Sequence, residues 1–210
     1  MVRHLNSFTD EKYKVMITLA PELMEATKKN AFEKTLRSEY KFEGRVFKAR
    51  LDEVLLPDGK QSKREIVEHG GGVGVLAVTA DGEVPLVRQY RHPYGEVIYE
   101  IPAGKLEKNE QPLSCGKREL YEETGFTATK WESLGVVYPS PGYCAEKIYI
   151  YFATDLSAGE NKLDDGEFLE CELIPIDTAV DMVMSGEISD SKTQIAILKA
   201  DKMLKEAKHD

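Results

Sequence analysis

Residues 104–126, GKLEKNEQPLSCGKRELYEETGF, constrain the fold of this 210-residue chain more than any other segment. Glu119, Glu122 and Glu123 stand at i, i+3 and i+4, which on an α-helix places their side chains on one face within roughly 100° of arc. Like charges at this spacing destabilise a helix by about 0.2–0.5 kcal/mol per pair. A divalent cation in front of the carboxylates explains the crowding, and oxygen donors favour Mg²⁺ or Mn²⁺ over Zn²⁺. The alternative is an ordinary solvated acidic face.

The residues around the acidic run favour the metal-binding interpretation. Pro112 suits the first turn of a helix, and Gly125 stands where a helix would end in a left-handed cap. Gly116 lies inside the helix, where glycine costs about 1 kcal/mol relative to alanine, so we expect close packing against that turn. An apolar run over 97–103 precedes Gly104. The segment therefore predicts a unit of strand, loop, acidic helix and turn.

The same segment resembles the Nudix box, which reads G, five residues, E, seven residues, REU, one residue, EE, one residue, GU, where U is a bulky apolar residue. The matching positions are Gly104, Glu110, Arg118, Glu119, Leu120, Glu122, Glu123, Gly125 and Phe126. The resemblance implies a hydrolase that cleaves a nucleoside diphosphate linked to another moiety, using water and Mg²⁺. It implies that Glu119 and Glu123 are the main metal ligands and that Glu122 is a further ligand or a bridge through water. It also implies that Arg118 and Glu110 orient the loop and the carboxylates.

Residues 1–69 are expected to form a small unit ahead of the main domain. The segment 21–36 predicts a helix with Pro21 in its first turn. Two strands are predicted over 40–54 and 64–69, and Pro57-Asp58-Gly59 between them predicts a turn. This part therefore reads as a helix followed by a small antiparallel β unit.

Residues 70–207 are expected to form the main domain. Helices are predicted over 177–185 and 191–207, the second capped by Asp190 or Ser191. Strands are predicted over 73–79, 83–90, the run before Gly104, 130–138, 145–155 and 168–175, with a polar loop over 156–167. This mixture of elements indicates an α/β or α+β domain. The resemblance implies more specifically an α/β/α sandwich with a mixed sheet.

The net charge and the cysteine content limit which partners the protein is expected to bind and in which compartment we expect it. The net charge of −9 disfavours nucleic acid as a partner, because such a surface would be basic. No stretch approaches a membrane span, and the polar N-terminal residues show no secretory signal. Three cysteines without a CxxC pattern are typical of reduced thiols, so we expect a cytoplasmic protein.

The flanks of the acidic segment suggest how a substrate is held. Arg88 and Arg91 lie near the end of a predicted strand, and the planar guanidinium suits a diphosphate. The alternative is a pair of surface arginines that offset the acidic fold. Pro141 and Tyr143 belong to a stiff loop that either stacks on a base or ribose or simply connects two strands.

A narrower resemblance bears on these alternatives. In Nudix hydrolases that cleave ADP-ribose, a proline follows the last glycine of the box by about sixteen residues, as Pro141 follows Gly125 here. The run RQYRHPYGEVIYEIPAGKLE, residues 88–107, is also similar to that subfamily. The resemblance implies that Arg91 contacts the substrate and that the Ala103 carbonyl is a metal ligand. It further implies a homodimer that exchanges an N-terminal β unit.

The reaction also requires a group that takes a proton from the attacking water. The resemblance places this acid in the loop 163–168, with Glu167 as the first choice and Asp165 as the second. A hydrated acidic loop is the alternative.

The predicted function is Mg²⁺-dependent hydrolysis of ADP-ribose, a nucleoside diphosphate sugar, to AMP and ribose 5-phosphate. Competing substrates are GDP-mannose, NADH, dinucleoside polyphosphates and oxidised nucleoside triphosphates. A non-catalytic ADP-ribose-sensing module is a further alternative, although such modules tend to lose box residues and all four box glutamates stand here.

Overall fold

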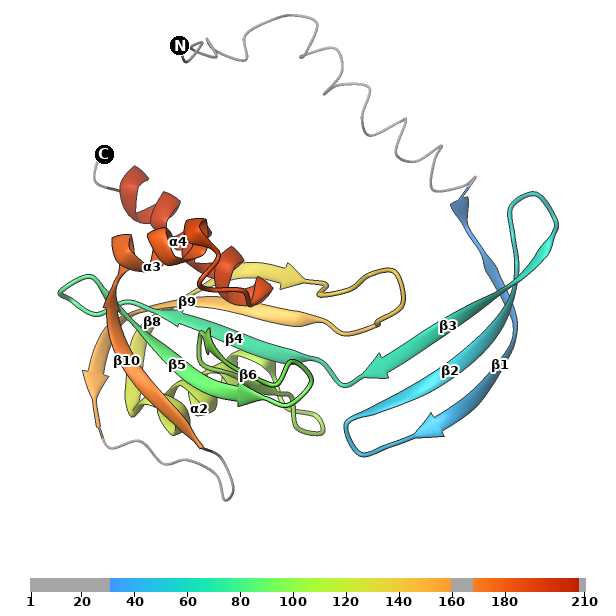
Figure 1. Cartoon of the computed structure of the whole chain (residues 1–210), viewed down its shortest axis with the longest axis horizontal. Helices are drawn as coiled ribbons and strands as arrows, with labels where there is room; N and C mark the ends of the chain where they lie inside the picture. Colours follow the sequence, from blue (N-terminus) through green and yellow to red (C-terminus); the bar gives the residue numbers. More distant parts are fainter. Residues whose placement is uncertain (1–30, 160–167, 208–210) are drawn as a thin grey trace, which may run out of the picture. The chain divides into compact units, whose positions relative to one another are not determined.

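The computed structural model describes residues 31–159 and 168–207 (Figure 1). The described residues divide into two compact units. The first holds those up to Glu43 together with Ala49–Ile66, and the second holds Gly44–Lys48 and those from Val67 onward.

The N-terminal strands form a three-stranded sheet in the order β1-β2-β3. Its strands are β1 (Lys34–Glu43), β2 (Phe47–Leu55) and β3 (Gln61–His69). The predicted turn before β3 is confirmed, because Gly59 has a φ of 83° and its N–H donates to the Leu56 carbonyl at 2.9 Å. Only glycine adopts this backbone conformation without strain.

Two sequence predictions for this region need correction. The strand predicted over 40–54 is two strands, β1 and β2, joined by a turn in which the Gly44 N–H donates to the Phe47 carbonyl at 3.0 Å. The helix predicted over 21–36 is wrong at its end, since β1 begins at Lys34. Leu36, Tyr40 and Phe42 share the two-residue period of a strand, and pairing with β2 outweighs the helical stripe. Residues 21–30 of that helix lie outside the described residues.

The second unit contains a mixed four-stranded sheet and an antiparallel three-stranded sheet. The mixed sheet has the order β7-β4-β9-β8, in which β4 and β9 are parallel and the outer pairs are antiparallel. The antiparallel sheet has the order β10-β5-β6. The strands are β4 (Gly72–Ala77), β5 (Glu83–Arg91), β6 (Glu96–Glu100), β7 (Ala103–Lys105), β8 (Phe126–Val137), β9 (Ile148–Ala158) and β10 (Leu169–Pro175). The predicted strands of the main domain are present with shifted ends, except that the run over 97–103 is divided between β6 and β7, which belong to different sheets.

Helices cover both faces of the mixed sheet, as Figure 1 shows. They are α2 (Pro112–Thr124), α3 (Ile176–Ser185) and α4 (Ser191–Glu206). Alternate residues of β4 face opposite sides. Val75 packs in a core cluster with Leu120 of α2, whereas Leu76 packs in the cluster that contains Ile197 of α4. The predicted mixed α+β sandwich is confirmed.

Helix α2 has the ends that its sequence predicts. Pro112 lies in the first turn, and Gly125 closes the helix in the left-handed conformation with a φ of 74°. A Cβ atom at Gly116 would lie 3.2 Å from Cγ2 of Val75, so the glycine lets α2 approach β4 closely.

Asp190 caps α4 by accepting from the Thr193 N–H. Among the described residues, no helix is long and apolar enough to cross a membrane.

Candidate active site

Two buried glutamates of α2 lie against the backbone of β7. Glu119 is 8% exposed and Glu123 is 3% exposed, although carboxylates seldom lie so deep without a partner. Glu123 Oε2 accepts a hydrogen bond from the Ala103 N–H at 3.1 Å. This bond fixes the Glu123 carboxylate beside Ala103, the residue whose carbonyl the family resemblance implies as a metal ligand.

Gly104 makes room for the second carboxylate. A Cβ atom at position 104 would lie 1.9 Å from Oε1 of Glu119, far inside van der Waals contact. The Glu119 carboxylate therefore occupies the space that any side chain at position 104 would need. Glu119 and Glu123 thus both lie against one short backbone segment, Ala103–Gly104.

Arg118 joins the acidic residues into one network. Its guanidinium forms a two-point ion pair with Glu110, with both nitrogen–oxygen distances at 3.1 Å. Its Nη1 donates to Glu119 at 2.7 Å and to Glu122 at 2.9 Å. Hydrogen bonds from Arg118 outweigh partial burial and lower the pKa of Glu110 to about 2, and the same pair raises the pKa of Arg118. Arg118 thereby offsets the repulsion among the glutamates.

The chemistry of the donor set fits a hard divalent cation. Carboxylate and carbonyl oxygens are what Mg²⁺ prefers, and Glu119, Glu123 and Ala103 bring such oxygens to one segment of backbone. Glu119 and Glu122 turn toward Arg118. Within the described part of the chain, no three acidic, histidine or cysteine side chains converge as a preformed cage.

Arg88 and Arg91 make separate sets of contacts on β5. Arg91 donates to Glu100 of β6, with one nitrogen–oxygen distance of 2.8 Å. Arg88 lies over the Tyr99 ring, 5.5 Å from its centroid, and pairs with Glu172 of β10 at 3.3 Å. Residues three apart on a strand point to opposite faces. The hydrogen bond that Arg91 donates to Glu100 raises the pKa of Arg91 against the opposing effect of burial, and the charge of Glu123 adds to the rise.

The other predicted site residues fall into two groups. Pro141 and Tyr143 are exposed in the loop between β8 and β9, where the Tyr143 carbonyl accepts from the Val67 N–H at 2.8 Å. Asp165 and Glu167 lie outside the described residues, so their predicted role stays a prediction.

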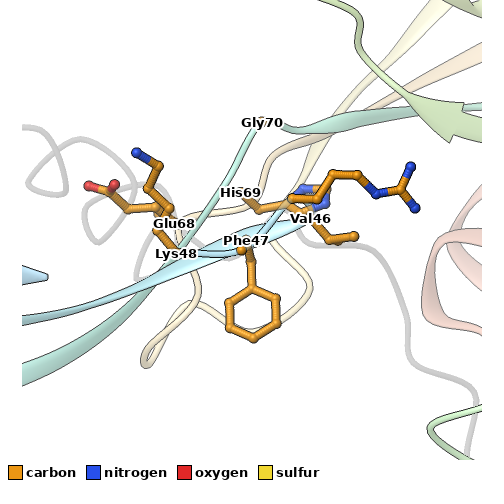
Figure 2. Close-up of a pocket in the computed structure, with 9 residues that line it drawn as sticks. Val46, Phe47, Lys48, Glu68, His69 and Gly70 are labelled. Carbon is orange, nitrogen blue, oxygen red and sulfur yellow. The ribbon is translucent and has the colours of Figure 1, made fainter. Parts of the chain in front are cut away.

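A separate hollow of about 480 Å³ lies at the end of β3 (Figure 2). Its lining residues are Gly44, Arg45, Val46, Phe47, Lys48, Glu68, His69, Gly70 and Ala145. All of them come from segments outside residues 103–126. The hollow is therefore distinct from the carboxylate site on α2.

Sequence reasoning missed three polar residues that lie close to this site. Glu100 is buried at the end of β6, where it binds Arg91 and Lys192, and Thr193 of α4 accepts from the Ile101 N–H at 2.8 Å. One signal was available, because Glu100 is an acid inside the apolar run 97–103. A lone buried charge requires a partner, but the sequence does not say that the partner comes from α4.

The matches to family models agree with this geometry. Residues 68–193 match the NUDIX domain, and residues 33–67 match the nucleoside diphosphate sugar hydrolase N-terminal domain. The chain therefore belongs to the Nudix family, because the NUDIX match alone covers more than half of its residues.

Several individual proteins are similar over most of their length. The chain is 46% identical to the ADP-ribose pyrophosphatase of Bacillus subtilis (strain 168) over 171 residues, which cover 80% of this chain and 92% of that one. It is also 46% identical to the methanol dehydrogenase activator of Bacillus methanolicus over 167 residues, 79% and 90% of the two chains. A solved structure of an ADP compounds hydrolase shares the fold, with a TM-score of 0.73 at 22% identity over 83% of this chain and 95% of that one.

Proposed function

We propose that this chain hydrolyses the diphosphate of ADP-ribose to AMP and ribose 5-phosphate in a Mg²⁺-dependent reaction. The observation that carries the proposal is the placement of two buried glutamates, Glu119 and Glu123, against the Ala103–Gly104 backbone. The identity of 46% to an ADP-ribose pyrophosphatase supports this substrate.

The metal would be held by oxygens of Glu119, Glu122 and Glu123 and by the Ala103 carbonyl. When bound, Mg²⁺ or Mn²⁺ neutralises charge on the diphosphate and lowers the pKa of a coordinated water. Arg118 holds Glu119 and Glu122 in place through hydrogen bonds of 2.7 and 2.9 Å. Glu110 in turn holds Arg118 and thereby orients the loop before α2.

The substrate would be gripped from β5 and from the loop between β8 and β9. Arg91, on whose guanidinium the charge of Glu123 acts, would bind phosphate, and Arg88 is the second candidate. Pro141 and Tyr143 would contact the nucleoside. In the reaction, a water oxygen bonds to one phosphorus and the bond from that phosphorus to the bridging oxygen breaks. Glu167, or alternatively Asp165, accepts the proton of that water.

The test is ³¹P detection of AMP and ribose 5-phosphate from ADP-ribose with Mg²⁺ present. Glu123→Gln removes the charge but keeps the shape, so kcat should fall by about 100-fold while the protein stays folded. Glu132→Gln, at an exposed position of β8, is the matched control and should keep the wild-type rate. A Glu123→Gln enzyme close to the wild-type rate would refute the metal assignment.

GDP-mannose is the second candidate substrate. The chain is 33% identical to a GDP-mannose pyrophosphatase of Enterobacter sp. (strain 638) over 146 residues, which cover 75% of that protein. A panel of ADP-ribose, GDP-mannose, NADH and dinucleoside polyphosphates, ranked by kcat/KM, decides between them. ADP-ribose should rank first, and a higher value for another compound reassigns the substrate.

We also propose that residues 1–69 form an arm that assembles a homodimer around a domain of residues 70–207. Residues 33–67, which lie within the described part of this arm, match the N-terminal domain model. A cytoplasmic location is consistent with the three cysteines, which are free thiols. Burial raises the pKa of the Cys115 thiol to about 12, so this residue resists oxidation.

A further inference from the structure

A buried charge network connects the start of α4 to the strand that precedes the carboxylate site. Glu100 and Lys192 are 2% and 8% exposed. The Glu100 carboxylate accepts hydrogen bonds from the guanidinium of Arg91 and from Lys192 Nζ. Burial alone would raise the pKa of Glu100, but these two cations outweigh it and lower the pKa.

Asp190 ties the same network to the backbone. Its Oδ2 accepts from Lys192 Nζ at 3.0 Å, from the Thr193 N–H at 3.0 Å and from Thr193 Oγ1 at 2.6 Å. Thr193 Oγ1 accepts in turn from the Ile101 N–H at 2.8 Å. Ile101 lies two residues before Ala103, so the start of α4 is fixed to the backbone segment that carries the Ala103 carbonyl.

The charges of the network balance only because Lys192 is present. Arg91 and Lys192 carry two positive charges, and Glu100 and Asp190 carry two negative ones. Without Lys192 these four groups keep a net charge of −1, and Arg91 is then the one cation among the described residues that still pairs with Glu100. An anionic diphosphate would then meet a negative field next to Arg91.

We infer that Lys192 is a positioning residue for the diphosphate site, acting through Glu100 on Arg91. This inference rests on the proposed function. It extends the site beyond the Nudix box, to which neither Lys192 nor Glu100 belongs. Lys192 shares Glu100 with Arg91, so the guanidinium keeps a fixed direction and part of its charge stays available to phosphate.

The alternative is that Lys192 only stabilises the fold by compensating buried acids. Loss of such a role would reduce the fraction of folded enzyme and so the apparent kcat, with KM unchanged. A positioning role instead raises KM for the anionic substrate. It also weakens ADP-ribose binding measured by calorimetry in the presence of EDTA, where no turnover occurs.

The experiment compares Lys192→Met with Lys199→Met. Lys199 lies on the same helix and donates to the Leu134 carbonyl, so its removal changes the net charge equally without touching the network. Lys192→Met should raise KM and the dissociation constant by about tenfold, and Lys199→Met should leave both within about twofold of wild type. The double variant Lys192→Met/Glu100→Gln removes the unpaired negative charge and should recover most of the lost affinity.

Two outcomes would overturn the inference. One is a folded Lys192→Met enzyme with wild-type KM and dissociation constant, and the other is an equal rise in Lys199→Met. If Lys192→Met alone does not fold, the loss of ADP-ribose affinity caused by Arg91→Ala is measured in wild type and in the double variant. Affinity losses by equal factors in both backgrounds would show that the network does not act on Arg91. A smaller loss in the double variant supports the inference.

Failure of the proposed function has a different signature. In that case wild type neither binds nor cleaves ADP-ribose but cleaves another compound of the panel. The Lys192 comparison is then made with that compound, and the same outcomes decide it.

Discussion

Glu119 occupies the space that any side chain at position 104 would take. The neighbouring carboxylate of Glu123 is held by the Ala103 N–H at 3.1 Å. Two adjacent residues of β7 therefore determine where the two buried carboxylates lie. Ala103 does so through its peptide N–H, and Gly104 does so through its lack of a side chain. A site that needs oxygens at defined positions is sensitive to small displacements here.

Gly104→Ala should abolish most activity with a modest effect on the fold. The new Cβ would lie 1.9 Å from Glu119 Oε1, so the carboxylate has to swing away from its position. A displacement of about 1 Å can lower turnover by about 100-fold, and we expect a loss of kcat of that size. Gly70→Ala is the control, because its Cβ meets no atom within 4 Å. Equal kcat values for the two variants at saturating Mg²⁺ would contradict the prediction.

Glu110 should make the stability of the protein depend on pH in the acid range. Hydrogen bonds from Arg118 lower its pKa from 4.5 to about 2 in the folded state. A lowered folded-state pKa contributes stability above the unfolded value, and this contribution is lost as the pH falls from about 4.5 toward about 2. The free energy of unfolding of wild type minus that of Glu110→Gln should therefore be positive at pH 6 and shrink toward pH 2.5. A difference that does not change with pH would exclude this ion pair as the cause.

Helix α2 begins, packs closely and ends at the residues where its local sequence predicts these features. Pro112 begins it, Gly116 lets it approach Val75 of β4, and Gly125 ends it with a φ of 74°. The helix delivers Glu119 and Glu123 to β7 only if its length and its distance from β4 are both correct. The ends of α2 are thus part of the site although they carry no chemistry.

The free energy of unfolding should be highest with glycine at position 125, lower with asparagine and lowest with alanine. A left-handed conformation costs an L-residue about 1–2 kcal/mol, and asparagine tolerates it better than most residues. Gly125→Ala should lower the free energy of unfolding by about 1 kcal/mol, and Gly125→Asn should lower it less. Urea unfolding measures both values. A Gly125→Ala protein as stable as wild type would show that the cap is not strained.

Elements with strong local signals were predictable from the sequence, and those set by long-range pairing were not. The acidic helix and the Asp190 cap of α4 follow from residues next to one another in the chain. The turn that separates β1 from β2 was missed because Gly44 in an alternating run reads equally well as a strand interior. The Glu100–Lys192 pair was missed because 92 residues separate its members.

At the scale of the whole molecule, the N-terminal unit is the part that carries an exposed apolar surface. All ten residues of β1 are exposed in a single chain. Leu36, Tyr40 and Phe42 lie on one face of this strand, because their positions differ by even numbers. An exposed apolar face of this kind on a thin sheet is typical of a protein–protein interface.

Phe42→Lys should therefore convert the proposed homodimer into a monomer. Light scattering after size exclusion should give twice the chain mass of 23.6 kDa for wild type and the single mass for the variant. Met184→Lys introduces the same charge at an exposed apolar position of α3 and should remain dimeric. If the arm also completes the substrate site, kcat/KM for ADP-ribose should fall in Phe42→Lys and not in Met184→Lys. A wild-type protein that elutes with the mass of one chain at micromolar concentration would refute the dimer, and a monomeric Phe42→Lys enzyme with full activity would limit the arm to assembly.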